Sequence, residues 1–241
     1  MSANSNTQLI DRLRADLSPL AGNLMRHLNK NSVPVEVVEP RAPRQFSERS
    51  ADHYKWHADN GATFYTVGKA YGEERIGTGM FLPGSKVDKD LQKACITRDH
   101  CRSMCLTLWP ALDQLFGGPD SEFEKILQLR CPISPRIVLL FDDEIGRENR
   151  VPHHDFFYLF KDEENAFIFD PAGAQFGFDK LVYRLNEYKP YLLWGLREVD
   201  GEEELDIHEA EGGAYNQMLF DLRPLYWECA RKRAMEHLAQ H

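Results

Sequence analysis

The sequence predicts a single α+β domain in which helices near both ends of the chain flank a mostly antiparallel sheet. Apolar residues recur at helical spacing in the first 30 residues and again in the last 30. The middle of the chain carries short runs rich in β-branched and aromatic residues, separated by turn residues. Strands gathered between helices, rather than alternating with them, are typical of the α+β class. The 241 residues, of which 42% are hydrophobic, suffice for one large domain with its own core.

Residues 1–46 are predicted to form a helical arm followed by an extended connector. Leucine and isoleucine recur at helical spacing over 9–17, and Ser18-Pro19 resembles an N-cap with proline at the first helical position. This pattern predicts a second helix to about Lys30. Three prolines predict an extended segment over 32–46. Because no separate core precedes the connector, we assign one domain to 1–241, with 47–241 as its main body.

The next elements are expected from turn residues and apolar stripes. Gly-containing turn residues between two β-rich runs predict a hairpin. Asp99 can cap a helix that begins at about His100, that Pro110 kinks or divides, and that Gly117-Gly118 ends. The remaining expected elements follow in chain order: hairpin strands 63–67 and 75–82, a helix at 121–130, strands 136–141, 154–160 and 166–170, a helix at 178–188, a strand at 191–197, and a long amphipathic helix at 214–239 with a kink at Pro224.

Composition and charge exclude several classes of function. The net charge is −9, and eight acids without a base lie between Glu198 and Glu211, which we interpret as a solvated loop. Phosphate binding needs clustered Lys and Arg, and the basic cluster at 231–233 is too small, so we expect no nucleic-acid partner. No apolar run is long enough to span a bilayer, and the N-terminus lacks a signal-peptide pattern. We therefore expect a cytoplasmic, soluble protein without a membrane partner.

Three of the five cysteines lie within eleven residues, and one of them is well placed to act as a nucleophile. A disulfide framework is unlikely for an odd number of cysteines in a cytosolic chain. Cys101 falls in the first turn of a predicted helix, where unpaired N–H groups and the helix dipole favour a thiolate. Cys105 falls on the apolar stripe of that helix and is expected to be a small buried hydrophobe. Cys95, just before the helix, remains an alternative nucleophile.

A base and a group that orients it can come from the next predicted hairpin. His153 and His154 begin an apolar strand, and successive residues point to opposite faces, so only one of them can face a given site. Asp170 ends the partner strand, and strand pairing would bring it near one of the histidines. The length of the turn leaves open which histidine Asp170 meets.

A helix-borne Cys, a strand-initial His and an Asp on the next strand resemble the transglutaminase-like and papain-like cysteine enzymes, including arylamine N-acetyltransferases. The similarity covers roughly 95–177, and it is strongest in His154-Asp-Phe-Phe-Tyr-Leu-Phe and Phe167-Ile-Phe-Asp-Pro171. The ending Asp170-Pro-Ala-Gly-Ala-Gln-Phe-Gly177 also resembles uncharacterised fungal proteins of that superfamily. The resemblance implies that Cys101 is the nucleophile, His154 the base and Asp170 the group that fixes its tautomer. It also implies an oxyanion site of backbone N–H groups at the helix start, although the cysteine lacks the family's usual Gly-x-Cys context.

These features predict a thiol hydrolase or acyltransferase that acts on an amide, ester or thioester of a small molecule or peptide, without a cofactor or metal. An alternative is a non-haem iron, 2-oxoglutarate-type oxygenase, because His153-His-Asp155 contains His-x-Asp and His208 could be the third ligand. A zinc site is a further alternative, although its ligand spacing is poor; it would use Cys95, His100, Cys101 and Cys105. A third alternative is a non-enzymatic protein-binding domain that uses the acidic run and the last helix.

Overall fold

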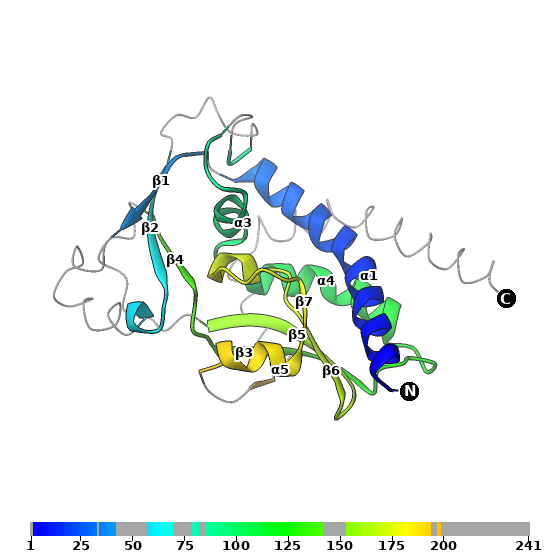
Figure 1. Cartoon of the computed structure of the whole chain (residues 1–241). Coiled ribbons are helices and arrows are strands. Elements are labelled where there is room, and N and C mark those ends of the chain that lie inside the picture. Colours follow the sequence, from blue (N-terminus) through cyan, green and yellow to red (C-terminus); the bar gives the residue numbers. More distant parts are fainter. Residues whose placement is uncertain are drawn as a thin grey trace.

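The part of the chain that the structure describes folds into two β-sheets and a set of helices packed around them (Figure 1). The computed structural model describes residues 2–32, 34–41, 57–69, 79–81, 85–141, 153–193 and 197–198. Its fold is α+β, as the sequence predicts, and its strand pairs are mostly antiparallel. The long helix expected at 214–239 lies outside the described residues.

The larger sheet has five strands and antiparallel pairing throughout, and it carries most of the core. Its centre is a hairpin predicted from the sequence: β5 (His153–Asp162) turns into β6 (Asn165–Phe169). The turn is held by the Asp162 carboxylate, which accepts hydrogen bonds from the backbone N–H groups of Glu164 and Asn165. The spatial order is β7-β6-β5-β3-β8. The three strands besides the hairpin are β7 (Val182–Arg184), β3 (Lys125–Pro132) and β8 (Arg197–Glu198).

The smaller sheet has three strands, in the order β1-β2-β4. β1 (Val35–Arg41) falls inside the segment expected to be an extended connector, and it pairs antiparallel with β2 (Thr63–Lys69). β4 (Ile137–Phe141), which the sequence predicts, pairs parallel with the other edge of β2. Since both edges of β2 are occupied, the hairpin expected between 63–67 and 75–82 is wrong.

The helices differ from the sequence prediction mainly at their boundaries. α1 (Ser2–Asn31) runs through Pro19 as one helix, so the break expected at Ser18-Pro19 is wrong. The Ser18 hydroxyl donates to the Arg14 carbonyl one turn back instead of capping a new helix. α4 (Cys101–Phe116) is the predicted helix; Pro110 does not divide it, and Gly117 caps its C-terminus as expected. The sequence missed α3 (Lys89–Thr97), whose N-terminus is capped by the Asp88 carboxylate.

Three further expectations are corrected by the structure. Residues 121–130 form no helix, because most of them enter β3, which hydrogen-bonds to β5 on one side and β8 on the other. The helix expected at 178–188 shrinks to α5 (Leu185–Tyr188) after the short strand β7, and the strand expected from Tyr191 begins as a 3₁₀ turn, η5 (Lys189–Tyr191). His100, not Asp99, is the N-cap residue of α4, and it makes no capping hydrogen bond through its side chain.

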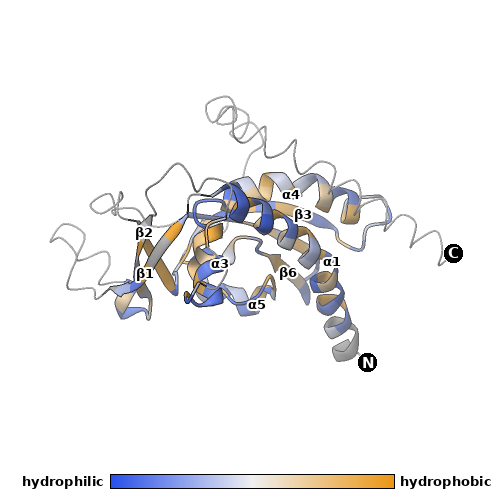
Figure 2. Ribbon diagram, turned by 90° about the horizontal axis from the view of Figure 1, so that it is seen from above, coloured by the Kyte–Doolittle hydropathy of each residue, from blue (hydrophilic) through white to orange (hydrophobic). Residues whose placement is uncertain are grey.

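The five-stranded sheet is covered on both faces. α1 and α4 lie over one face of the sheet (Figure 2). Leucines of both helices share a core there with Phe157, Phe167 and Phe169. The other face packs against Phe178, α5 and η5: the Tyr188 ring lies on Phe156, and Tyr183, which belongs to β7 of the sheet, packs on Tyr188. Within the described part of the chain, no helix has the length and apolarity needed to cross a membrane.

Candidate active site

His154 and Asp170 meet because of the register of the β5–β6 hairpin. Phe157 lies opposite Phe169, and one further step along the two chains brings Asp170 opposite Phe156. Phe156 and His154 lie two residues apart on β5 and therefore on the same face of the sheet. The His154 Nε2–H donates to Asp170 Oδ1 over 2.8 Å, with both side chains fully buried. His153 is exposed and lies on the opposite face, so the register selects His154 as the partner of Asp170.

The Asp170 carboxylate is held from three directions. Besides His154, the Tyr188 hydroxyl donates to Oδ2 over 2.7 Å and the Ala172 backbone N–H donates to Oδ1 over 3.3 Å. Burial raises the pKa of Tyr188 well above its ordinary value, and the neighbouring Asp170 charge adds to this rise. Tyr188 therefore keeps its proton and remains a donor to the carboxylate. An ionised carboxylate with several donors is well suited to orient an imidazole.

The Asp170 carboxylate fits against Gly173 because this residue has no side chain. A Cβ at position 173 would lie 2.4 Å from Asp170 Oδ2, closer than van der Waals contact allows. We therefore expect Gly173→Ala to displace the carboxylate, to weaken its bond with His154 and to lower the melting temperature. The displacement can be measured as a change in the ¹⁵N chemical shifts of the His154 ring.

Gly118→Ala is the matched control, because a Cβ at position 118 meets nothing within 4 Å. It should leave both the ring shifts and the melting temperature close to those of the wild type. Identical ring shifts in Gly173→Ala and Gly118→Ala would show that Gly173 has no influence on the carboxylate.

The environment of His154 favours its protonated form. Burial lowers the pKa of this ring, but the charge and hydrogen bond of Asp170, with a smaller contribution from the Cys101 thiol, outweigh burial and raise it to about 10. Three aromatic rings surround the imidazole, and Phe176 is the nearest, with its centroid 4.8 Å away. His154 is thus a buried imidazolium at neutral pH, held between a carboxylate and a thiol.

Cys101 is the first residue of α4, and its thiol donates to Asp155, the residue that follows His154 on β5. The hydrogen-bond and charge interactions of its thiol contribute to the raised pKa of His154. The thiol is only partly buried, whereas His154 and Asp170 are fully buried. The structure therefore brings His154 and Asp170 into contact and places the Cys101 thiol against Asp155, the residue next to His154 on β5.

Asp155 is a fourth member of the site. Its Oδ2 accepts from the Cys101 thiol over 3.8 Å. Both of its oxygens also accept from Arg130: Oδ1 from Nε over 2.9 Å and Oδ2 from Nη2 over 3.1 Å. Arg130 lies directly opposite Asp155 in the β3–β5 ladder, so the two side chains share a face. Asp155 therefore joins Arg130 to the thiol at the start of α4.

The ligand sets of the two metal alternatives do not converge in the described residues. No group of three His, Cys, Asp or Glu side chains in these ranges is arranged to hold a metal ion. The oxygenase model needs Asp155 as a ligand, but both of its oxygens already bond to Arg130. His208, its third ligand, lies outside the described residues, as does the acidic run beyond Glu198.

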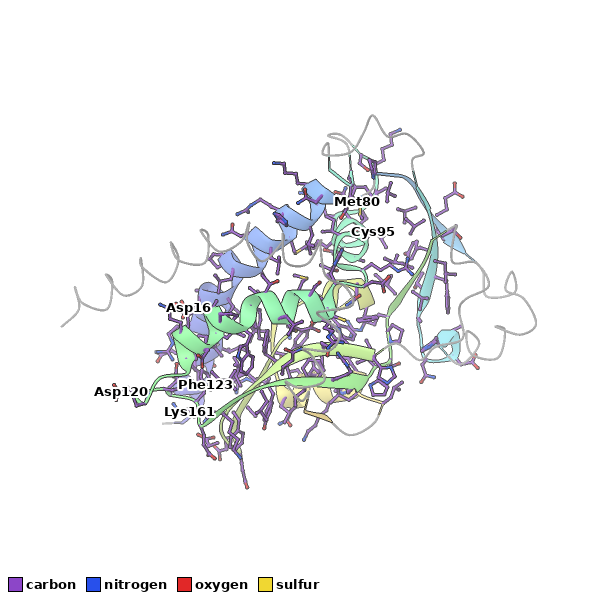
Figure 3. The ribbon with its side chains drawn as sticks, turned by 180° about the vertical axis from the view of Figure 1, so that it is seen from behind. Asp16, Met80, Cys95, Asp120, Phe123 and Lys161 are labelled. Atoms are coloured by element: carbon purple, nitrogen blue, oxygen red, sulfur yellow. The ribbon has the colours of Figure 1, made fainter. Side chains whose placement is uncertain are left out.

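The other cysteines of the described ranges are buried thiols. Cys95 is part of α3 and lies beside Met80 against the three-stranded sheet (Figure 3); burial raises its pKa to about 12, although Arg98 opposes the rise. Cys105 lies in the core between α4 and the larger sheet, as expected from the apolar stripe. Cys131 lies opposite His154 in the ladder, and burial, followed by the Asp170 and Asp155 charges, raises its pKa to about 12. Cys229 lies outside the described residues.

Sequence reasoning missed four side chains of this site: Arg130, Cys131, Gln175 and Tyr188. Arg130 and Cys131 are missed because the sequence predicts a helix at 121–130. The observed pairing of β3 with β5 places them opposite Asp155 and His154. Tyr188 and Gln175 carry no local sequence signal, since their roles depend on how the chain after Asp170 folds back over the sheet.

The arrangement provides a partly exposed sulfur at a helix start, a buried imidazolium and a carboxylate that orients it. Such a set can attack a carbonyl carbon and move protons between the sulfur, the imidazole and a leaving group. Comparisons with protein-family models, with curated proteins and with solved structures found no match.

Proposed function

We propose that this protein is a cysteine-dependent hydrolase or acyltransferase that acts on an amide, ester or thioester through an acyl-enzyme. The observation that carries the proposal is the buried 2.8 Å bond from His154 Nε2 to Asp170, with the Cys101 thiol 3.8 Å from Asp155, the residue next to His154 on β5. A structural ion pair would need no thiol at a helix start on its open side. This order of groups is what nucleophilic catalysis by cysteine requires.

In the proposed reaction, the Cys101 thiolate attacks the acyl carbonyl carbon and forms a carbon–sulfur bond. The carbonyl oxygen becomes an oxyanion, which the N–H groups at the start of α4 can stabilise. As the intermediate collapses, the bond to the leaving group breaks, and the leaving group takes the Nδ1 proton of His154. Water or another acceptor then attacks the thioester carbonyl carbon while Nδ1 takes its proton. Collapse of this second intermediate breaks the carbon–sulfur bond, releases the acid or the acylated acceptor, and restores the thiolate–imidazolium pair.

Asp170 keeps the ring in place during both half-reactions. Its bond with Nε2–H holds the ring plane so that Nδ1 continues to face the sulfur. Tyr188 and the Ala172 N–H hold the carboxylate in turn. The proposal requires a small-molecule or peptide acyl donor as substrate and no metal or cofactor.

The proposal is tested by trapping the acyl-enzyme. The purified chain is mixed with p-nitrophenyl acetate, quenched in acid within seconds and examined by intact-mass and peptide mass spectrometry. We expect one acetyl group per chain, carried by the peptide that contains Cys101. An acetyl group on lysines alone, or on Cys95 or Cys229 in place of Cys101, would contradict the proposal.

A further inference from the structure

Gln175 links the backbone that precedes α4 to the His154 ring on β5. It lies in the 3₁₀ helix η4 (Gly173–Phe176), is only 5% exposed and reaches between α4 and β5. Its Oε1 accepts the backbone N–H of Asp99 over 3.0 Å. Its Nε2 lies 3.5 Å from His154 Nδ1.

The bond with Asp99 determines which way the Gln175 amide points. A backbone N–H can only donate, so the amide oxygen must face Asp99 and the NH₂ group must face His154. Because Nδ1 of the imidazolium also carries a proton, the NH₂ group packs against the ring and can donate to Nδ1 only after Nδ1 has lost that proton. Buried on nearly all sides, the side chain cannot rotate freely between the two partners. Gln175 therefore fixes the distance between the backbone of residue 99 and the imidazole of residue 154.

Asp99, which donates its backbone N–H to Gln175, has an unusual backbone conformation. Asp99 has φ 58°, in the left-handed region that a residue with a Cβ adopts at a cost of about 1 kcal/mol. It lies two residues before Cys101, and His100, the N-cap residue of α4, makes no capping hydrogen bond through its side chain. The bond to Gln175 therefore stabilises the turn that delivers Cys101 to the start of α4.

We propose that Gln175 is a positioning residue that holds the first turn of α4, and with it Cys101, against His154. The inference rests on the proposed function, because it concerns the geometry of the same site. If the bond to Asp99 is lost, the strained turn can relax and the sulfur moves away from Nδ1. A displacement of about 1 Å can lower the rate of a reaction about 100-fold.

Two substitutions separate the roles of the two ends of the side chain. Gln175→Met keeps the approximate shape but removes both polar contacts, whereas Gln175→Glu keeps an oxygen that can accept the Asp99 N–H. Gln92→Met is the matched control: Gln92 is a half-buried glutamine on α3 whose amide donates to the Val87 carbonyl.

The first measurement is the rate at which iodoacetamide alkylates Cys101, followed by peptide mass spectrometry at a temperature where every variant is folded. We expect Gln175→Met to slow this reaction about 10- to 100-fold and Gln175→Glu to recover most of the loss. Gln92→Met should stay within about a factor of two of the wild type. If Gln175→Met melts earlier but alkylates at the wild-type rate, Gln175 is merely structural and the inference is overturned.

The second measurement is amide hydrogen exchange at Asp99, read by NMR, and it does not depend on catalysis. Exchange should accelerate at least about 10-fold in Gln175→Met, in proportion to the lost hydrogen bond. Slow Cys101 alkylation in the wild type together with fast Asp99 exchange in the variant would sink the proposed function but support the Gln175 link. Unchanged exchange at Asp99 would overturn the link itself.

Discussion

Cys101→Ala should abolish the fast alkylation of the protein and all acyl transfer, with little change in stability. The reason is that Cys101 is the thiol beside the imidazolium of His154, while Cys95 and Cys131 have pKa values raised to about 12 and are protonated at neutral pH. The side chain of Cys101 is only partly buried, so its loss opens no closed cavity. The rate can be followed with iodoacetamide, with the melting temperature measured in parallel.

Cys105→Ala is the matched control, one helical turn further along α4. This thiol is fully buried in the core, so its loss should cost about 1 kcal/mol of unfolding free energy and leave the fast alkylation intact. If the fast reaction survives in Cys101→Ala and is lost in another cysteine variant, the nucleophile has been misassigned. If no cysteine reacts faster than free cysteine, the thiol mechanism is excluded and a binding function becomes the better hypothesis.

Asp170→Asn should produce the largest loss of stability among substitutions that keep the shape of the site. The substitution leaves His154 buried without its counter-charge, and breaking a buried ion pair costs about 3–5 kcal/mol at pH 7. Without the carboxylate, burial is opposed only by the smaller contribution of Cys101, so the pKa of the imidazole falls and the ring becomes neutral. Alkylation of Cys101 should slow as well, because the imidazolium that favours the thiolate is lost. Urea unfolding and the iodoacetamide assay measure the two effects.

The pH dependence of stability gives a separate test of the His154–Asp170 pair. His154 has its pKa raised from 6.5 to about 10 in the folded protein, so the folded state binds the extra proton. The stabilisation is complete below pH 6.5 and is lost as the pH rises toward 10. Cys95 and Cys131, with pKa values raised from 9.0 to about 12, contribute a similar decline only above pH 9.

Between pH 6.5 and 9, the unfolding free energy of the wild type should therefore fall, and that of Asp170→Asn should stay nearly flat. Asp162→Asn, at the exposed turn of the same hairpin, is the control and should retain the wild-type slope. Equal slopes in the wild type and Asp170→Asn would show that Asp170 does not raise the pKa of His154.

The candidate triad could be found from the sequence because its parts follow local patterns. The spacing of apolar residues predicts α4, and two apolar runs around an Asp162–Asn165 turn predict the β5–β6 hairpin. The choice between His153 and His154 could not be made, because a shift of one residue in register exchanges the two faces of a strand. Only the observed pairing of Phe157 with Phe169 decides it.

The missed elements are those whose structure depends on distant partners. Residues 121–130 are rich in Glu, Lys, Leu and Gln, which favour a helix locally, yet hydrogen bonds to β5 and β8 make most of them a strand. Ser18-Pro19 has the form of a helix start, but the continuous apolar face of α1 on the core outweighs it. Gln175 gains its role only when η4 meets the turn before α4.

The wide separation of the site's residues along the chain has a consequence for refolding. His154 and Asp170 are 16 residues apart and meet within one hairpin, whereas Cys101 and Asp155 are 54 residues apart and meet only after α4 docks on β5. Local contacts close faster than distant ones, because loop closure costs more entropy as the intervening chain lengthens. We therefore expect the histidine–aspartate pair to assemble early during folding. The reactivity of Cys101 would then return last and would report completion of the native topology.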